Sequence, residues 1–192
     1  MSLLFTSPLE WWLDLSAEQI AQSRQQSRQT ATPLSQYQHF LNHLCVQVMV
    51  PWLKTEYDAD AVIWPQPEAL PSLWDVVDGV AIALNGVRVL LVPSETIDTD
   101  GFSVPQEWVD IPSWAADYYI AVQVNLDQSY VRAWGYTSHA HLKQKGIYDA
   151  TDRTYDIRRE CLGLDFNAFW VICQHCPETL DREALNREAL NR

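Results

Sequence analysis

Two cysteines near the end of the chain have a spacing that could chelate a metal ion. Cys173 and Cys176 are three positions apart in the run Cys-Gln-His-Cys, which also contains His175. Zinc prefers thiolate and imidazole ligands, but a closed structural site needs four of them. The other cysteines are isolated, and His39 and His43, four positions apart, could complete the set. The pattern favours packing of small apolar thiols at a helix end, and we predict no metal and no cofactor.

Carboxylates offer a second possible chemistry, in the segment VPQEWVDIPSWAADYY (104–119). The segment contains Glu107, Asp110 and Asp117, and two carboxylates in differently tuned environments can act as general acid and base. Spacing alone does not bring the three together, and acids in such a loop more often cap turns. The chain also lacks G-x-S-x-G, H-E-x-x-H, a phosphate-binding loop and a dinucleotide fingerprint. A hydrolase, acid–base or metal-dependent, is the least favoured function, and the sequence leans away from an enzyme.

Aromatic residues surround these acids in the sequence. On an extended strand, Trp134 and Tyr136 would share one face with Arg132. Buried tryptophans would supply core area, which is the favoured interpretation for the set. Any tryptophan that stays exposed beside acids would form a recognition patch. The candidate binding surface consists of Glu107, Trp108, Asp110, Trp114, Asp117, Trp134 and Tyr136.

Composition and charge restrict the partners. The 192 residues are 47% hydrophobic and 20% charged, which is typical of a globular chain with a sizeable core. The formal net charge is −12 and no basic patch is visible. A phosphate backbone would be repelled at long range, so we expect no direct contact with nucleic acid.

Targeting signals are not evident. The N-terminal stretch has no basic region and carries Glu10 and Asp14, unlike a secretory signal. Residues 30–53 hold no formal charge, but polar residues and proline interrupt them, so a buried amphipathic helix explains them better than a membrane span. The four cysteines are expected to be reduced thiols. These features predict a cytoplasmic protein without membrane contact.

The elements that must position these residues fall into two groups. Ser16 and Gln19 fit a capping box before a helix over 17–29. A second helix is predicted over 34–53 from apolar residues at spacings of three and four, with a kink or an early end at Pro51. Asn85-Gly86, between alternating runs, predicts a tight hairpin. Further expected elements are two strands within 118–138 joined around Asp127-Gln128, a short helix over 139–146, a strand over 153–159 and a helix from Asp165.

The order of these elements predicts an α+β fold. We expect an N-terminal helical layer packed on a small antiparallel β-sheet or barrel, with a closing C-terminal helix. A single domain would cover residues 1–178, divided into a helical part (8–58), a β-rich part (61–160) and the closing helix (163–176). The tail, 179–192, repeats five residues without building an apolar stripe and is expected to be polar and partly helical.

Parts of the chain resemble a known family. The segment VPQEWVDIPSWAADYY and the run RAWGY carry most of the likeness, which covers roughly residues 9–176 and leaves the tail outside. On these residues the chain resembles a cyanobacterial family described as a domain of unknown function, number 1822. The resemblance implies a cytoplasmic setting, and the family's gene neighbourhoods imply a regulatory or adaptor role. It supplies no catalytic residues.

Two functions of different classes therefore lead. The favoured one is a non-enzymatic adaptor that binds another protein, one with a basic surface, through the acidic-aromatic surface defined above. The alternative is a small-molecule-binding domain in which Trp108, Trp114 and Trp134 surround a cavity.

Overall fold

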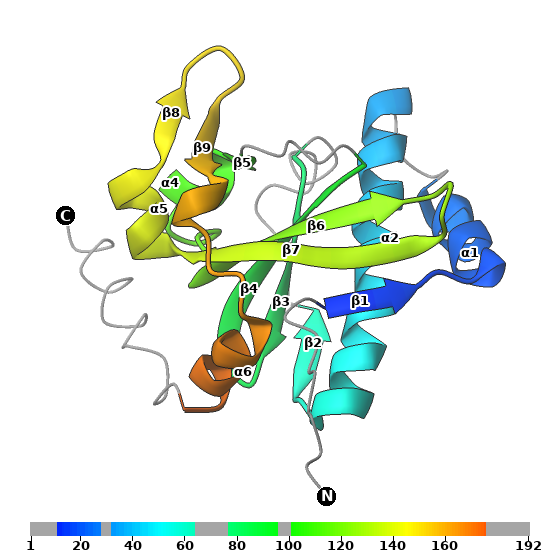
Figure 1. Cartoon of the computed structure of the whole chain (residues 1–192). Helices are drawn as coiled ribbons and strands as arrows, with labels where there is room; N and C mark the ends of the chain where they lie inside the picture. The colour runs from blue at the N-terminus through cyan, green and yellow to red at the C-terminus, as the bar shows by residue number, and fades with distance from the viewer. Residues whose placement is uncertain (1–10, 28–31, 64–76, 96–100, 176–192) are drawn as a thin grey trace, which may run out of the picture.

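The fold is α+β, as the sequence predicts, and is built around a six-stranded sheet (Figure 1). The structure is a computed structural model that describes residues 11–27, 32–63, 77–95 and 101–175. Long helix α2 (Pro33–Tyr57) lies against one face of the sheet, and a three-stranded sheet with short helices covers part of the other. No helix within the described ranges is long and apolar enough to cross a membrane.

The main sheet is mixed, not purely antiparallel as expected. From edge to edge its strands are β1 (Trp11–Asp14), β7 (Tyr130–Ser138), β6 (Tyr118–Asn125), β4 (Val87–Ser94), β3 (Val80–Leu84) and β2 (Ala61–Ile63). All neighbours pair antiparallel except β4 and β6, which are parallel. A parallel pair needs a crossover connection, and here the chain leaves β4, passes through the second sheet and returns to β6.

The two predicted hairpins of this sheet are confirmed. Asn85 and Gly86 join β3 to β4 with φ of 50° and 81°, the left-handed conformations that a type I′ turn requires. β6 and β7 are joined around Asp127 and Gln128, where the Asn125 side chain accepts a hydrogen bond from the Gln128 N–H at 2.8 Å.

The first strand lies inside a region that was expected to be helical. β1 pairs with β7, and its burial alternates, with Trp11 and Leu13 buried and Trp12 and Asp14 exposed. This period of two is typical of a strand with one face on the core. The helical part predicted over 8–58 therefore also contains a strand that the sequence analysis did not expect.

Helices cover the first face of the main sheet. The capping box before α1 (Ala17–Ser27) is confirmed, because the Ser16 N–H donates to Gln19 Oε1 at 2.8 Å and the Gln19 N–H donates to Ser16 Oγ at 3.1 Å. α2 does not end at Pro51 but continues to Tyr57. The closing helix, α6 (Phe166–His175), follows Asp165 as predicted, and the Asp165 side chain accepts hydrogen bonds from the first N–H groups.

A smaller sheet stands over the other face. Its strands are β5 (Gly101–Pro105), β9 (Thr154–Arg158) and β8 (Ile147–Asp149), all antiparallel, in the order β5-β9-β8. The strand over 153–159 and the short helix over 139–146, observed as α5 (His139–Lys145), are confirmed. One-turn helix α4 (Glu107–Asp110) and a 3₁₀ turn, η1 (Arg159–Cys161), complete the described elements.

The main sheet is buried on both faces, so the molecule has two cores. In β4, Val89 and Leu91 belong to the core beneath the helices, whereas Leu90 and Val92 belong to the core beneath the small sheet. A strand buried on both sides is expected to be continuously apolar, as the run VLLV in β4 is. The second core is the one that reaches the residues singled out from the sequence.

Candidate ligand-binding site

The tryptophans of the predicted surface are buried in the second core. Trp108 is 0% exposed, Trp114 is 1% exposed and Trp134 is 4% exposed. The rings of Trp108 and Trp114 pack together with centroids 5.2 Å apart. Core packing was the favoured interpretation for these residues, and it is confirmed. These three indoles are therefore not the exposed tryptophans that a recognition patch would need, because the small sheet and α4 cover this face of the main sheet.

Trp134 and Tyr136 do not share a face, contrary to the expected alternation. Val122 pairs with Ala133 and Ala121 pairs with Gly135, so Trp134 has no partner across the strands. This is a β-bulge, which places an extra residue in one strand and re-aims the side chains beyond it. As a result, Trp134 belongs to the second core, whereas half-buried Tyr136 packs against the first.

The predicted acids are engaged with neighbouring side chains. Asp110 accepts hydrogen bonds from Lys143 at 2.8 Å, from Tyr155 at 3.0 Å and from Gln106 at 3.0 Å. Burial acts against ionisation of Asp110, but the hydrogen bonds outweigh it and hold its pKa below the usual value. Glu107 forms an ion pair with Arg153 at 3.0 Å.

Asp117 joins three elements rather than facing a partner. Its Oδ2 accepts a hydrogen bond from the Arg88 N–H at 2.9 Å, and its N–H donates to the Arg88 carbonyl at 2.8 Å. Its own carbonyl accepts the His139 N–H at 2.9 Å. Asp117 thereby ties β4 to the start of α5, which is a structural role.

The hydrogen bonds that Asp110 accepts from Lys143, Tyr155 and Gln106 should stabilise the protein in a pH-dependent way. Because the folded state lowers the pKa of Asp110, its contribution is present above the usual aspartate pKa and is lost as the pH falls through the lowered one. We expect Lys143→Met to lower the unfolding free energy at neutral pH by no more than about 1 kcal/mol, and the loss to vanish in acid. Urea titrations at both pH values measure it, with the exposed Lys145→Met as the control. An equal loss at both pH values would contradict the ion-pair account.

The metal candidates do not come together within the described residues. Cys173 is 1% exposed and lies in the first core, which confirms thiol packing, while exposed His175 contacts the Val171 carbonyl through Nδ1 at 2.9 Å. Cys176 lies outside the described residues. His39 and His43 are neighbours on α2, with ring centroids 5.9 Å apart. In the described part of the chain, no three His, Cys, Asp or Glu side chains are placed to hold a metal ion.

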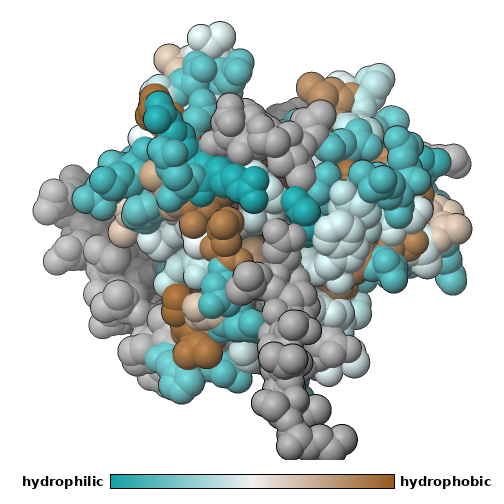
Figure 2. All heavy atoms as spheres, viewed as in Figure 1, coloured by the Kyte–Doolittle hydropathy of each residue, from teal (hydrophilic) through white to brown (hydrophobic). Residues whose placement is uncertain are grey.

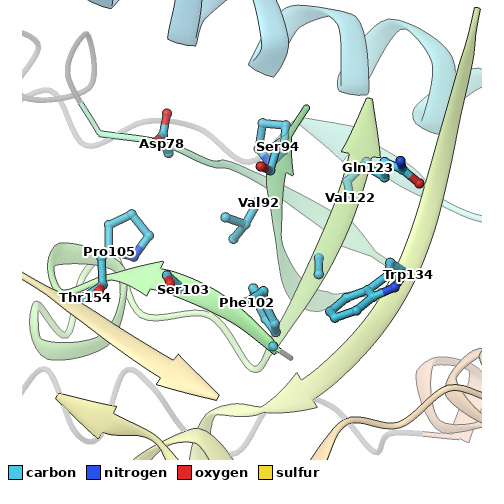
Figure 3. A pocket seen from close by; sticks show the side chains of 13 residues that line it. Asp78, Val92, Ser94, Phe102, Ser103, Pro105, Val122, Gln123, Trp134 and Thr154 are labelled. Carbon is cyan, nitrogen blue, oxygen red and sulfur yellow. The ribbon is translucent and has the colours of Figure 1, made fainter. Parts of the chain in front are cut away.

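A pocket of about 270 Å³ lies between the two sheets (Figure 3). One wall comes from β4 and β6 of the main sheet, and the opposite wall comes from β5 and Thr154 of the small sheet. Asp78, just before β3, and Trp134, at the bulge, close it. We call this the inter-sheet pocket. Its volume is near the lower end of the range for small-molecule sites.

Asp78 is held firmly at the edge of this pocket. Its carbonyl accepts the Trp108 indole N–H at 2.8 Å, and the next N–H, of Gly79, donates to Asn42 of α2 at 3.1 Å. Burial raises the pKa of the Asp78 carboxyl, while a hydrogen bond from Gln38 acts the other way. Its place in a concave site, together with this direction of the pKa shift, makes Asp78 a candidate functional residue.

The main-sheet wall carries a polar pair among apolar side chains. Ser94 and Gln123 are partners in the parallel pairing of β4 and β6, as are Val92 and Ala121. Gln123 Oε1 is buried and makes no hydrogen bond with any described residue. Most buried polar atoms in proteins are paired, so this carbonyl is an unused hydrogen-bond acceptor of a residue that lines the pocket.

The sequence identified this site only in part. Of the three tryptophans expected around a cavity, Trp134 lines the pocket. Trp108 does not line it but donates a hydrogen bond to the Asp78 carbonyl, and Trp114 packs on Trp108. Asp78 was missed because Asp-Gly before a strand is an ordinary turn signal. Gln123, a polar residue inside the apolar run YYIAVQV, was the one local signal of a polar site within the core.

Of the comparisons with known proteins, only the one with family models gives a match. A family model described as "Protein of unknown function (DUF1822)" matches residues 13–192. The match includes the tail, so the expected limit of the resemblance near residue 176 is wrong. No curated protein and no solved structure matches the chain.

Proposed function

The chain belongs to the DUF1822 family, whose description states no function, and we propose from its geometry that it binds a small molecule in the inter-sheet pocket. The observation that carries the proposal is the buried Oε1 of Gln123 in the pocket wall, which has no hydrogen-bond partner among the described residues. Leaving such an acceptor unpaired costs about 1–3 kcal/mol. A ligand that donates a hydrogen bond there would recover that cost.

The remaining lining supports a binding role. The pocket combines apolar and aromatic side chains, among them Val92, Phe102 and Trp134, with a few polar groups at fixed positions. This is the usual composition of a small-molecule site. Both walls consist of regular strands, so the lining is pre-formed. Ligand binding would therefore cost little conformational entropy of the protein.

The adaptor role stays a prediction with less geometric support. Its surface would combine the acids with whichever tryptophan stays exposed, but Trp108, Trp114 and Trp134 are all buried. Asp110 and Glu107 already pair with basic side chains of the same chain. A partner with a basic surface would have to displace these pairs.

A ligand-observed NMR screen with a chemically varied fragment library tests the proposal. We expect fragments that bind saturably and compete with one another for one site. Ser103→Phe, which adds a ring at an exposed position of the pocket lining, should abolish their binding. Gln144→Phe, which adds the same ring at an exposed position of α5, should leave it intact. An empty screen, or hits indifferent to Ser103→Phe, would overturn the proposal.

The variant Gln123→Leu tests whether the Gln123 amide serves ligand binding or the stability of the fold. We expect the variant to unfold at a free energy about 1 kcal/mol higher than the parent, because it removes an unpaired buried carbonyl, and to bind the screening hits more weakly. Urea denaturation and NMR titration measure the two effects. Gln25→Leu, on the exposed face of α1, is the control and should change neither. A loss of stability in Gln123→Leu would show that the amide serves the fold.

A further inference from the structure

The charge of the inter-sheet pocket restricts what it can hold. Among the described residues that line it, Asp78 is the one ionisable side chain; Arg132, the cross-strand partner of Gln123, is outside the lining and lies over the Trp12 ring. The chain as a whole carries a formal charge of −12. A phosphate or carboxylate would therefore meet a half-buried acid and no counter-charge in the lining, whereas a cation would find one.

Three of the polar groups of the pocket lie along one edge, whereas the hydroxyls of Ser103 and Thr154 lie on the side of the small sheet. Figure 3 shows Asp78, Ser94 and Gln123 along one edge, Phe102 and Trp134 toward the opposite edge, and Val92 between them. The polar edge offers acceptors: a carboxylate, a hydroxyl and the unpaired amide carbonyl. The other edge offers aromatic rings, which attract apolar bodies and cations. A matching ligand has a donor group at one end and an apolar body at the other.

We propose that the inter-sheet pocket takes a small organic amine, with its ammonium group toward Asp78 and Gln123 and its apolar body against Trp134 and Phe102. An ammonium group has three donors and no acceptor, which suits an edge made of acceptors. It also supplies a counter-charge for the half-buried Asp78 carboxylate. The inference rests on the proposed small-molecule function and specifies its ligand class.

The bulge in β7 makes such a site possible. With regular pairing, residues 134 and 136 would lie on the same face; the bulge leaves the Trp134 ring on the small-sheet side and turns Tyr136 to the helix side. Ala121, the small residue of β6 beside the bulge, lines the pocket together with the indole. The space that a larger side chain would fill is thus left open next to an aromatic ring.

Three probes with one ring and different head groups test the ligand class: 2-phenylethylamine, 2-phenylethanol and phenylacetate. Calorimetric or NMR titration of the full chain should show the amine binding at least about tenfold more tightly than the alcohol, because charge-assisted hydrogen bonds are the stronger ones. Phenylacetate should not bind detectably. Ser103→Phe should abolish binding of the amine, which locates it in the pocket.

Asp78→Asn should remove the preference for the amine while keeping the shape of the side chain. Asp127→Asn removes the same charge from an exposed turn and should keep the preference, which controls for net charge. If Asp78→Asn does not fold, the ranking of the three probes on the parent chain still decides.

The outcomes separate the two proposals. Equal binding of amine and alcohol, or tighter binding of phenylacetate, would overturn the amine assignment, and so would the absence of binding by all three. In each case the small-molecule function would still be judged by the unbiased fragment screen. An empty screen as well would overturn both.

Discussion

Replacing Trp108 by Ala should lower the free energy of unfolding by about 3–5 kcal/mol, the range for deleting a fully buried large aromatic side chain. Trp108 is completely buried and packs on Trp114. Its indole N–H also holds the Asp78 carbonyl at 2.8 Å. The variant therefore loses both core volume and an anchor of the inter-sheet pocket. Urea denaturation monitored by circular dichroism measures the loss.

Two further variants separate the effect of lost core volume from that of the lost hydrogen bond and supply an exposed control. Trp108→Phe keeps much of the volume but removes the hydrogen bond to Asp78, so it should be less destabilising yet still weaken ligand binding. Trp12→Ala is the control, because Trp12 is 49% exposed and stacks on Tyr130 at the sheet edge, where such a contact is worth about 1 kcal/mol. Similar losses for Trp108→Ala and Trp12→Ala would contradict the burial described for the second core.

Gly163→Ala should destabilise the protein by about 2–3 kcal/mol, the cost of overpacking a filled site. Gly163 and Tyr136 exchange two backbone hydrogen bonds, of 2.8 and 2.9 Å, and the Tyr136 ring lies directly over the glycine. An added methyl group would overlap the ring atoms. The ring has little room to retreat, because it packs on Phe166 and Phe169 with centroids 5.4 and 4.8 Å away.

A double-mutant cycle with Tyr136→Ala tests the cause. Once the ring is absent, Gly163→Ala should cost much less, and the two changes should be strongly non-additive. Thermal and urea unfolding of the four proteins supply the cycle. If Gly163→Ala costs the same with or without the ring, the loss must come from the backbone at position 163 and not from Tyr136.

Local signals in the sequence predicted the local structure well. The Asn85-Gly86 turn depends on the backbone conformation of its own two residues, and the Ser16 capping box and the helix after Asp165 depend on hydrogen bonds between residues two or three positions apart. Such signals keep their meaning in almost any surrounding fold. They also established the α+β class, because they place helices at both ends of a run of strands.

The features of the fold and of the site that the sequence did not predict depend on contacts between distant residues. The parallel pairing of β4 with β6 cannot be derived from either strand alone. The bulge at Trp134 requires the register of both β6 and β7, and without it the alternation rule assigned Tyr136 to the wrong face. Asp78 gains its environment from α2 and from Trp108, far away in the chain. Of the residues that line the pocket, the sequence analysis therefore singled out Trp134 alone.

The parallel neighbours at the centre of the main sheet also affect how fast the protein folds. Hairpins β3–β4 and β6–β7 each close between adjacent segments, which takes microseconds in small systems. β4 and β6, in contrast, can pair only after the intervening chain has looped out and back, and closing such long loops is entropically slow. The two hairpins are thus expected to form early and to dock late. The inter-sheet pocket, whose walls include β4 and β6, comes into existence only with that last step.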